Sequence, residues 1–200
     1  MTNIKFIQTI VLSIIVMMTT TLVHSADWVL DATQSQLNFV SIKKGSVAEI
    51  HQFQNIQGSL DSEGQLKINI DLSSVDTNID IRNERLKTFL FEIDKFTTAT
   101  LTATIAPSIL DAIPEGGSAR ITVDSTLNLH GESEPLEIDV VITRLVGAKL
   151  SAVSVTPIII NAGNFSLIAG IDKLMALAKL PSISHAIPVN FYLTFSLKRD

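Results

Sequence analysis

A carboxylate and a histidine lie close together in a segment that has the pattern of a β-strand. Glu49 and His51 are two positions apart within residues 47–56, so both side chains would point to the same face of the strand. Such a pair can transfer a proton, orient the head of a ligand, or form an ordinary surface contact. The sequence by itself leaves these three interpretations open.

Two arginines and a lysine are candidates for binding an anion. Arg82 and Arg85 are three residues apart in a predicted helix and can share one of its faces, and Lys43 ends a predicted strand. Side chains of these types bind phosphate groups. The alternative is a solvated helix face on which Asp80 and Glu84 pair with the two arginines.

Residue types that carry metal or thiol chemistry are scarce. The chain has no cysteine, which excludes thiol catalysis, disulfides and lipid attachment to an N-terminal cysteine. After residue 25 the only histidines are His51, His130 and His185, and their spacing does not fit a metal site. No nucleophile elbow, P-loop or dinucleotide-binding glycine motif occurs. We predict no metal, no cofactor and no enzymatic activity, with an enzyme that uses Glu49 and His51 as the alternative.

Eight segments have strand patterns. Four alternate strictly between apolar and polar residues, as strands with one buried face do. The strict segments are residues 66–72, 119–130, 136–142 and 187–197, and the weaker ones are residues 35–42, 47–56, 98–105 and 150–160. Eight antiparallel strands with apolar inner faces form either a sandwich or a closed barrel, and the pattern does not decide between them.

Two segments have helical patterns. In the first, Thr77 and Asp80 resemble an N-terminal capping pair followed by apolar residues on one face. The second spans residues 171–180 and ends before Pro181. It lies within residues 163–184, and we expect it either to cover the sheet or to act as a lid over one end.

The N-terminal residues have the pattern of a secretory signal peptide. Lys5 gives a charged start, residues 6–18 are almost all apolar, and the residues up to Ser25 are small or polar. We expect residues 1–25 to be cleaved, leaving a periplasmic domain of residues 26–200, with cleavage after Ala26 as the alternative. The apolar run is shorter than the roughly 20 residues that span a bilayer, so we predict no permanent membrane anchor.

The charge of the chain limits its partners. The formal net charge is −5 at pH 7, and removing residues 1–25 takes away one lysine and no acid, which makes it about −6. No basic run stands out, so we predict no nucleic-acid partner. Net charge alone also gives no attraction to anionic lipid.

In residues 74–87 a predicted strand ends in Ser-Val-Asp-Thr and an arginine-bearing helix follows. This motif, the most specific of several, resembles the signature of the YceI-like family. Weaker matches are Asp27-Trp28, Ser35-x-x-x-Phe39, Phe89-Leu90-Phe91, and residues 125–131 with a return strand near Pro135-Leu136. The chain departs from the family pattern at Lys43, where many members have histidine, at Thr97, where proline is usual, and in residues 163–184.

The resemblance implies a fold and a ligand. The fold would be mainly β, an eight-stranded antiparallel lipocalin-like barrel with one or two short helices. The ligand would be a polyisoprenoid or the tail of an isoprenoid quinone, carried or sequestered in a lengthwise apolar tunnel, and a homodimer is a further expectation. An alternative is a module that docks on a membrane or a protein through residues 163–184.

The chain has nine phenylalanines and one tyrosine. Aromatic side chains without hydroxyl groups suit a hydrocarbon ligand. The alternative for each apolar candidate is a place in an ordinary packed core. The candidates for the tunnel lining are Phe39, Phe53, Ile79, Leu86, Phe89, Phe91, Phe96, Leu127, Leu129, Phe165, Phe191 and Phe195, and those for the ligand head are Lys43, His51, Arg82 and Arg85.

Overall fold

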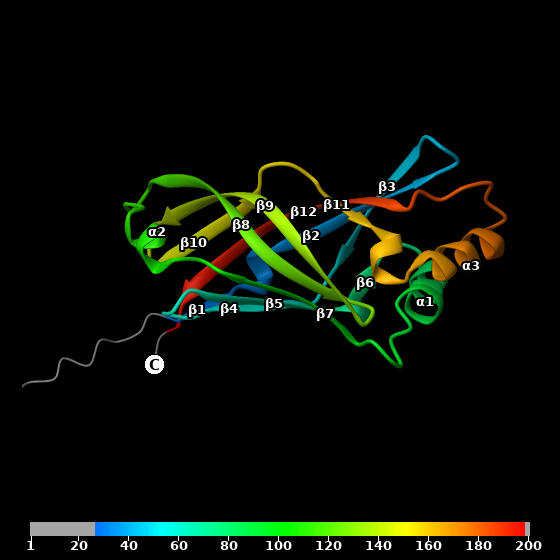
Figure 1. Cartoon of the computed structure of the whole chain (residues 1–200), viewed down its shortest axis with the longest axis horizontal. Helices are drawn as coiled ribbons and strands as arrows, with labels where there is room; N and C mark the ends of the chain where they lie inside the picture. Colours follow the sequence, from blue (N-terminus) through cyan, green and yellow to red (C-terminus); the bar gives the residue numbers. More distant parts are fainter. Residues whose placement is uncertain (1–26, 199–200) are drawn as a thin grey trace, which may run out of the picture.

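The strands belong to one antiparallel sheet (Figure 1). The computed structural model describes residues 27–198, so the predicted signal peptide and its cleavage site lie outside the described residues. The strands within this range are β1 (Trp28–Leu30), β2 (Gln36–Lys43), β3 (Val47–Phe53), β4 (Ile56–Leu60), β5 (Gln65–Asp71), β6 (Val75–Asp76), β7 (Thr98–Thr104), β8 (Ser118–Leu129), β9 (Glu132–Leu145), β10 (Lys149–Ser154), β11 (Ile158–Asn161) and β12 (Ala186–Leu197).

Eight of these strands close into a ring. Their order is β1-β4-β5-β7-β8-β9-β10-β12, and β12 returns to β1. Trp28 pairs with Leu60 of β4 on one edge and with Leu197 of β12 on the other. Closure leaves the ring without a free edge. The prediction of an eight-stranded antiparallel barrel is confirmed, and the sandwich alternative is wrong.

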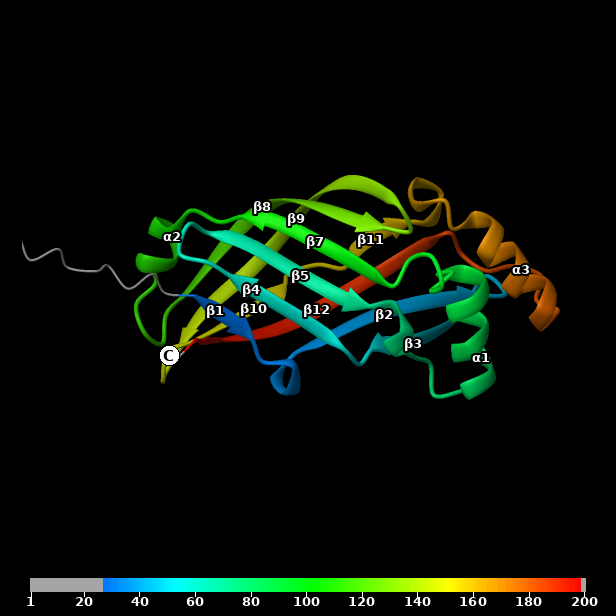
Figure 2. The same ribbon diagram turned by 90° about the horizontal axis from the view of Figure 1, so that it is seen from below.

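The long strand β12 changes partners along its length. Its C-terminal part pairs with β10 and β1, whereas its N-terminal part pairs with β11 and β2. Beyond the ring the sheet therefore continues as β11-β12-β2-β3-β6, which we call the open half. Figures 1 and 2 show β2 and β3 extending past the ring toward the helices.

The eight predicted strand segments are not the eight strands of the ring. The predictions missed β1, β4 and β6, and two predicted segments became β2 and β3, which lie outside the ring. Residues 150–160 were predicted as one strand but form β10 and β11. Pro157 lies between these two strands, and a proline has no N–H to continue a ladder of hydrogen bonds.

Two helices cover the open half at one end of the long axis (Figures 1 and 2). They approach each other closely at Gly170, where a Cβ atom would lie only 2.5 Å from the carbonyl oxygen of Phe89. A short third helix lies at the opposite end, where Leu110 is buried in the core. The helices are α1 (Asp80–Arg85), which continues into a π-helical turn (Leu86–Leu90), α2 (Pro107–Asp111) and α3 (Ile168–Ala178).

The predicted helix boundaries need correction. The capping role assigned to Thr77 is wrong, because α1 begins at Asp80 and its N-cap is Ile79, which makes no side-chain cap hydrogen bond. The Thr77 hydroxyl instead donates to Asn83 Oδ1 at 2.6 Å. The other helix, α3, begins at Ile168, three residues earlier than predicted.

Two apolar clusters fill the two halves of the molecule. One lies inside the closed ring and includes Trp28, Ile68 and Phe195. The other lies between the open half and the helices and includes Leu72 and Phe165. Across residues 27–198, none of the helices has the length and apolar character needed to cross a membrane.

Replacing Gly64 with alanine should destabilise the fold much more than the same change at Gly45. Both residues have positive φ angles, of 85° and 76°. A Cβ at Gly64 would lie 1.9 Å from the carbonyl oxygen of Ile105, whereas nothing lies within 4 Å at Gly45. We expect Gly45→Ala to cost about 1 kcal/mol of strain and Gly64→Ala roughly 1–3 kcal/mol more from overpacking. Urea denaturation of both variants measures the difference, and equal losses would contradict it.

Candidate ligand-binding cavity

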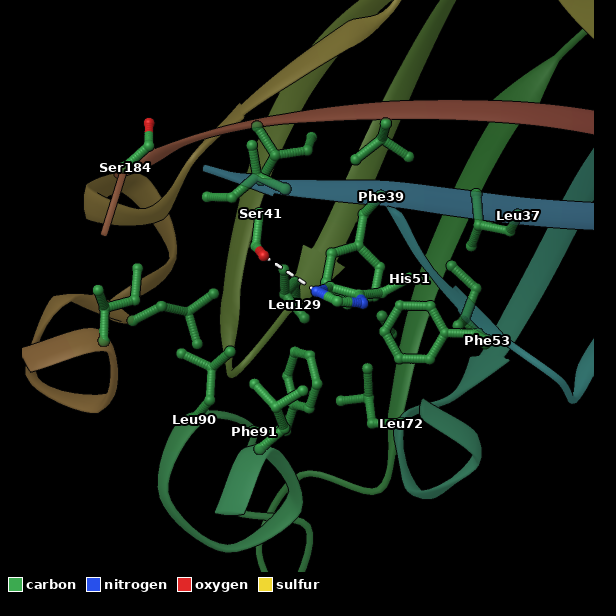
Figure 3. Close-up of a pocket in the computed structure, with 18 of the residues that line it drawn as sticks. Leu37, Phe39, Ser41, His51, Phe53, Leu72, Leu90, Phe91, Leu129 and Ser184 are labelled. Carbon is green, nitrogen blue, oxygen red and sulfur yellow. Dashed lines mark hydrogen bonds between the residues drawn. The ribbon is translucent and has the colours of Figure 1, made fainter. Parts of the chain in front are cut away.

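A cavity of about 380 Å³ lies between the open half of the sheet and the helices (Figure 3). Its volume falls in the range of roughly 300–1,000 Å³ that is typical of ligand pockets. Its lining is apolar except for six polar residues. These polar residues are Ser41, Lys43, His51, Arg82, Arg85 and Ser184.

The inward side chains of β2 face the cavity and are only partly buried. In β2 no residue is fully buried, although Leu37 and Phe39 face inward. Phe53 lies between two aromatic neighbours, with its ring centre 5.4 Å from that of Phe39 and 5.7 Å from that of Phe91. Figure 3 shows these rings around a common space. Their faces form an apolar wall without hydroxyl groups, which suits a hydrocarbon.

A second cavity of about 100 Å³ lies inside the closed ring and is also apolar. Five side chains line both cavities and therefore form a partition between them. The partition residues are Leu37, Ile70, Leu101, Ile138 and Phe191.

Most of the residues predicted to line a ligand tunnel lie at one of these cavities. Phe195 lines only the smaller cavity. The larger cavity is lined by Phe39, Phe53, Leu86, Phe91, Leu127, Leu129 and Phe191.

Two predicted lining residues of the first helix do not line either cavity. Ile79 is the N-cap of α1 and is half exposed. Phe89 lies under Lys173 of α3, whose Nζ atom is 5.6 Å from the ring centre. The π-helical turn explains the error at Phe89, because its extra residue per turn rotates the following side chains and brings Leu90 to the cavity instead.

Phe96 and Phe165 are also corrections to the predicted lining. Phe96 packs on the ring of His130, with 4.4 Å between the ring centres, and lines neither cavity. Phe165 is only 1% exposed and is enclosed by the apolar cluster behind the cavity. It fills an ordinary core position, which was the alternative for each of these residues.

The helix in residues 163–184 was expected to cover the sheet or one end of it, but none of its side chains was predicted to line the cavity. Leu174 and Ala178, one helical turn apart, face the cavity, and Ile183 and Ile187 line it further along the chain. The helical spacing of Leu174 and Ala178 was visible in the sequence, but it does not tell which surface the helix covers. The position of α3 shows that residues 163–184 form part of the cavity wall.

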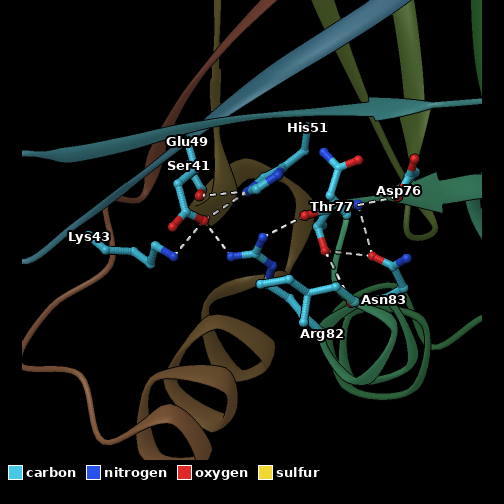
Figure 4. A network of polar contacts seen from close by, with 10 residues as sticks. Ser41, Lys43, Glu49, His51, Asp76, Thr77, Arg82 and Asn83 are labelled. Atoms are coloured by element: carbon cyan, nitrogen blue, oxygen red, sulfur yellow. Dashed lines mark hydrogen bonds and ion pairs between the residues drawn. The ribbon is translucent and has the colours of Figure 1, made fainter.

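Glu49 is the centre of a polar cluster at the helix end of the cavity (Figure 4). Its Oε2 atom accepts from Lys43 Nζ at 2.6 Å and also from Arg82 Nη1. Arg82 Nη2 donates to the carbonyl oxygen of Thr77 at 2.6 Å. The Lys43 hydrogen bond, followed by the positive charge of Arg82, lowers the pKa of Glu49. The ionised carboxylate of Glu49 therefore holds the side chains of Lys43 and Arg82 in place.

His51 lies beside this cluster and is only 4% exposed. Its Nε2 atom is 2.9 Å from Ser41 Oγ and 3.8 Å from Glu49 Oε2, so Ser41 is its hydrogen-bond partner. Burial and, to a smaller extent, the charge of Arg82 lower the pKa of His51 from 6.5 to about 4. A general base works best when its pKa is near the operating pH. The geometry and the charge state thus give the acid–base interpretation of Glu49 and His51 no support.

The two predicted arginines have different surroundings. Both line the cavity, but Arg82 pairs with Glu49, whereas Arg85 makes no ion pair within residues 27–198. The alternative, in which the helix acids pair with the two arginines, is wrong, because Arg82 pairs with Glu49 and Glu84 contacts Lys87 at 3.0 Å. With His51 neutral, the cavity end carries three cations against one carboxylate.

The described residues contain no group of three or more His, Cys, Asp or Glu side chains arranged to hold a metal ion.

The chain matches known proteins in both sequence and fold. Residues 28–195 match the model of the YceI-like domain family. A solved polyisoprenoid-binding domain from Saccharophagus degradans, implicated in plant cell wall breakdown, is similar over 86% of this chain and 98% of its own, with 36% identity and a TM-score of 0.84. No curated protein sequence matches significantly.

Two more distant structures are similar in fold. BcnA from Burkholderia cenocepacia is 17% identical over 82% of this chain and 98% of its own, with a TM-score of 0.61. The YCEI protein from Campylobacter jejuni is 16% identical over 75% of this chain and 85% of its own, with a TM-score of 0.54.

Replacing His51 with glutamine should reduce the loss of stability in mild acid. Between pH 6.5 and about 4 the unfolded chain binds a proton that folded His51 does not, so stability falls as the pH falls. The difference amounts to about 3 kcal/mol once the pH is below both pKa values. We expect urea denaturation at about pH 7.5 and about pH 4.5 to show a smaller loss for His51→Gln than for the unmodified protein.

The control for this experiment is the same substitution at His185, which is exposed. His185→Gln should lose as much stability as the unmodified protein over the same pH interval. If His51→Gln also loses that much, burial of a neutral histidine does not contribute to the acid sensitivity.

Proposed function

Because the chain belongs to the YceI-like domain family, we propose that it binds the hydrocarbon chain of a polyisoprenoid lipid or of an isoprenoid quinone in the larger cavity. The observation that carries this proposal is the open apolar cavity in a chain 36% identical to a polyisoprenoid-binding domain. The smaller cavity beyond the partition would extend the site toward a lengthwise tunnel.

The free energy of binding would come from burial of hydrocarbon. Each buried CH₂ contributes about 0.8 kcal/mol, so a five-carbon unit contributes roughly 3 kcal/mol or more as an upper bound. Ordering the chain and desolvating the polar groups at the cavity end reduce the measured affinity. A lining that is apolar except at one end suits such a ligand, because hydrocarbon needs no hydrogen-bond partners.

The ligand head would lie at the polar cluster around Glu49. Lys43, Arg82 and Arg85 supply positive charge there for acceptor oxygens, whether these belong to a phosphate or to a quinone. His51 Nδ1 and Arg82 Nε are buried and have no hydrogen-bond partner among residues 27–198. A buried polar atom without a partner costs about 1–3 kcal/mol, so a head group that bonds to them would gain this amount.

The biological role would be that of a periplasmic carrier or sequestering protein rather than an enzyme. The signal-peptide pattern of the first 25 residues supports export. The low pKa of His51 and the ion pairs of Glu49 leave no poised acid–base pair at the cavity.

Lipid extraction and mass spectrometry of protein purified from a bacterium that makes polyisoprenoids test this proposal. We expect a bound polyprenyl species, and its mass identifies the head group. In Val189→Trp the indole would occupy cavity space, since Val189 lines the cavity and is half-buried. Displacing only two CH₂ groups should lower the affinity at least about tenfold, and with it the amount of lipid that stays bound.

The matched control is Ile159→Trp, on β11 with its side chain exposed, which should keep its lipid. Folded, lipid-free protein from every such host would overturn the proposal. Equal lipid loss in the two tryptophan variants would show that the cavity is not the site.

The partition is expected to limit the length of the bound chain. Phe191 lines both cavities, so Phe191→Leu should widen the passage into the smaller cavity and shift the bound population toward longer chains. The measurement is the distribution of chain lengths extracted from each protein after exposure to a mixture of polyprenols.

Phe195→Leu is the control, because Phe195 lines only the smaller cavity. It removes the same atoms from a buried phenylalanine and should leave the upper length limit where it is. If the two variants select identical lengths, the partition does not act as a limit.

A further inference from the structure

Three segments lie together at one end of the long axis. They are the turn between β2 and β3 with the adjoining strand ends (residues 42–50), α1 with its π-helical turn (residues 79–90), and α3 with the segment after it (residues 168–185). Figures 1 and 2 both place them at the end opposite α2. We call these three segments the mouth end, because all the polar lining of the larger cavity comes from them or from Ser41 and His51 next to them.

Charge is distributed unevenly between the mouth end and the rest of the molecule. The remainder of residues 27–198 has six Lys or Arg and fifteen Asp or Glu. The mouth end has seven Lys or Arg and four Asp or Glu, which are Lys43, Lys44, Arg82, Arg85, Lys87, Lys173 and Lys179, and Glu49, Asp80, Glu84 and Asp172. A protein with a net negative charge thus presents a net positive end.

Large apolar side chains are exposed at the same end. On α1, Ile81 is 60% exposed, and on β3, Ile50 is 69% exposed. Val47, Ile79 and Leu177 are also exposed, so each of the three segments contributes at least one such side chain. Exposed apolar side chains among cations are typical of surfaces that bind at the interface of a bilayer.

Some of the side chains that line the cavity are also exposed to solvent at this end. Ala178 of α3 lines the cavity and is also exposed to solvent. Lys43 and Arg82 line it too, and their side chains are 17% and 25% exposed. A ligand that leaves the cavity here would therefore pass directly between the cations and the exposed apolar side chains.

We propose that the mouth end docks on the surface of a bilayer that contains anionic phospholipid. Positive charge attracts it to the headgroups, and the isoleucines of α1 and β3 enter the interface. A second copy of the chain is a poorer partner, because a two-fold contact through this end would bring two positive surfaces together. The inference rests on the proposed function for its purpose, since docking would place the cavity opening at the membrane that holds the lipid.

Vesicle co-sedimentation tests the docking. The folded protein should bind vesicles of phosphatidylglycerol mixed with phosphatidylcholine and should not bind vesicles of phosphatidylcholine alone. Raising the salt from about 0.1 M to about 1 M shortens the Debye length from about 10 Å to about 3 Å and should weaken the binding strongly. Lys44→Glu with Lys179→Glu should weaken it at least about 25-fold, on the basis of about fivefold per cation.

Two control variants make matching changes away from the mouth end, at the end of the molecule that carries α2, which we call the far end. Lys67→Glu with Lys198→Glu makes the same change in net charge on β5 and after β12, and should change binding less than about twofold. For the apolar contribution, Ile81→Ser should weaken binding, whereas Val146→Ser, at a still more exposed position in the turn after β9, should not.

Three results would overturn the docking proposal. They are equal binding to both kinds of vesicle, no binding to either, and equal effects of the mouth-end and far-end variants. A dimer that depends on Lys44 and Lys179 would assign the surface to a second copy instead. The lipid content of each variant separates this proposal from the proposed function, because a protein that keeps its polyprenyl ligand but ignores the vesicles refutes docking alone.

Discussion

The pairing of β12 with two successive partners on each edge determines the rest of the structure. Where β12 pairs with β10 and β1, the sheet closes, and the interior is filled apart from a cavity of about 100 Å³. Where it pairs with β11 and β2, the sheet continues outward without closing, and helices must cover its apolar face. The larger cavity is the space that these helices leave, so it follows from the length of one strand.

The polar cluster beside this apolar space is stable because its charges satisfy one another. A buried ion pair is favourable only when further hydrogen bonds compensate for lost hydration. Glu49 accepts from two cations, and Arg82 also donates to a backbone carbonyl. His51 avoids the cost of a buried charge by remaining neutral, which its lowered pKa reflects. The cluster therefore keeps donors at the cavity wall and leaves Arg85 without a carboxylate partner among residues 27–198.

Local alternation predicted most strands, but it could not predict closure. Strands β8, β9 and β12 are long enough to show the pattern clearly, whereas β1 has three residues and β4 has five, including Gly58. At Gly58 a Cβ would lie 2.5 Å from Ile68 Cδ1 on β5 and 3.3 Å from Leu30 Cβ on β1, so the glycine leaves room for side chains of two neighbouring strands. Such a contact leaves no periodic signal in the sequence.

The same limit applies to the site. Alternation places Phe53 on an inward face, but whether such a face meets a cavity or a packed core depends on how far apart the two sides of the molecule lie. Phe53 lies at the cavity and Phe165 in the core, although both were predicted to line the tunnel. The polar candidates were easier to identify, because a charged residue near an apolar segment needs an ion-pair partner or access to solvent. All four of them line the larger cavity.

The arrangement of charge and cavity also constrains how a lipid would be exchanged. A hydrocarbon chain that crosses water loses about 0.8 kcal/mol for each CH₂ exposed, which makes transfer through solution very slow for a long chain. A chain that passes from a bilayer into an apolar cavity placed against it exchanges one apolar environment for another. With the polar cluster at the mouth end, the tail would enter first and advance toward Phe191, and the head would stay near Arg85. If the mouth end docks as proposed, its positive charge and the apolar interior would serve the same transfer step, and the negative charge of the remaining surface would favour this one orientation toward an anionic membrane.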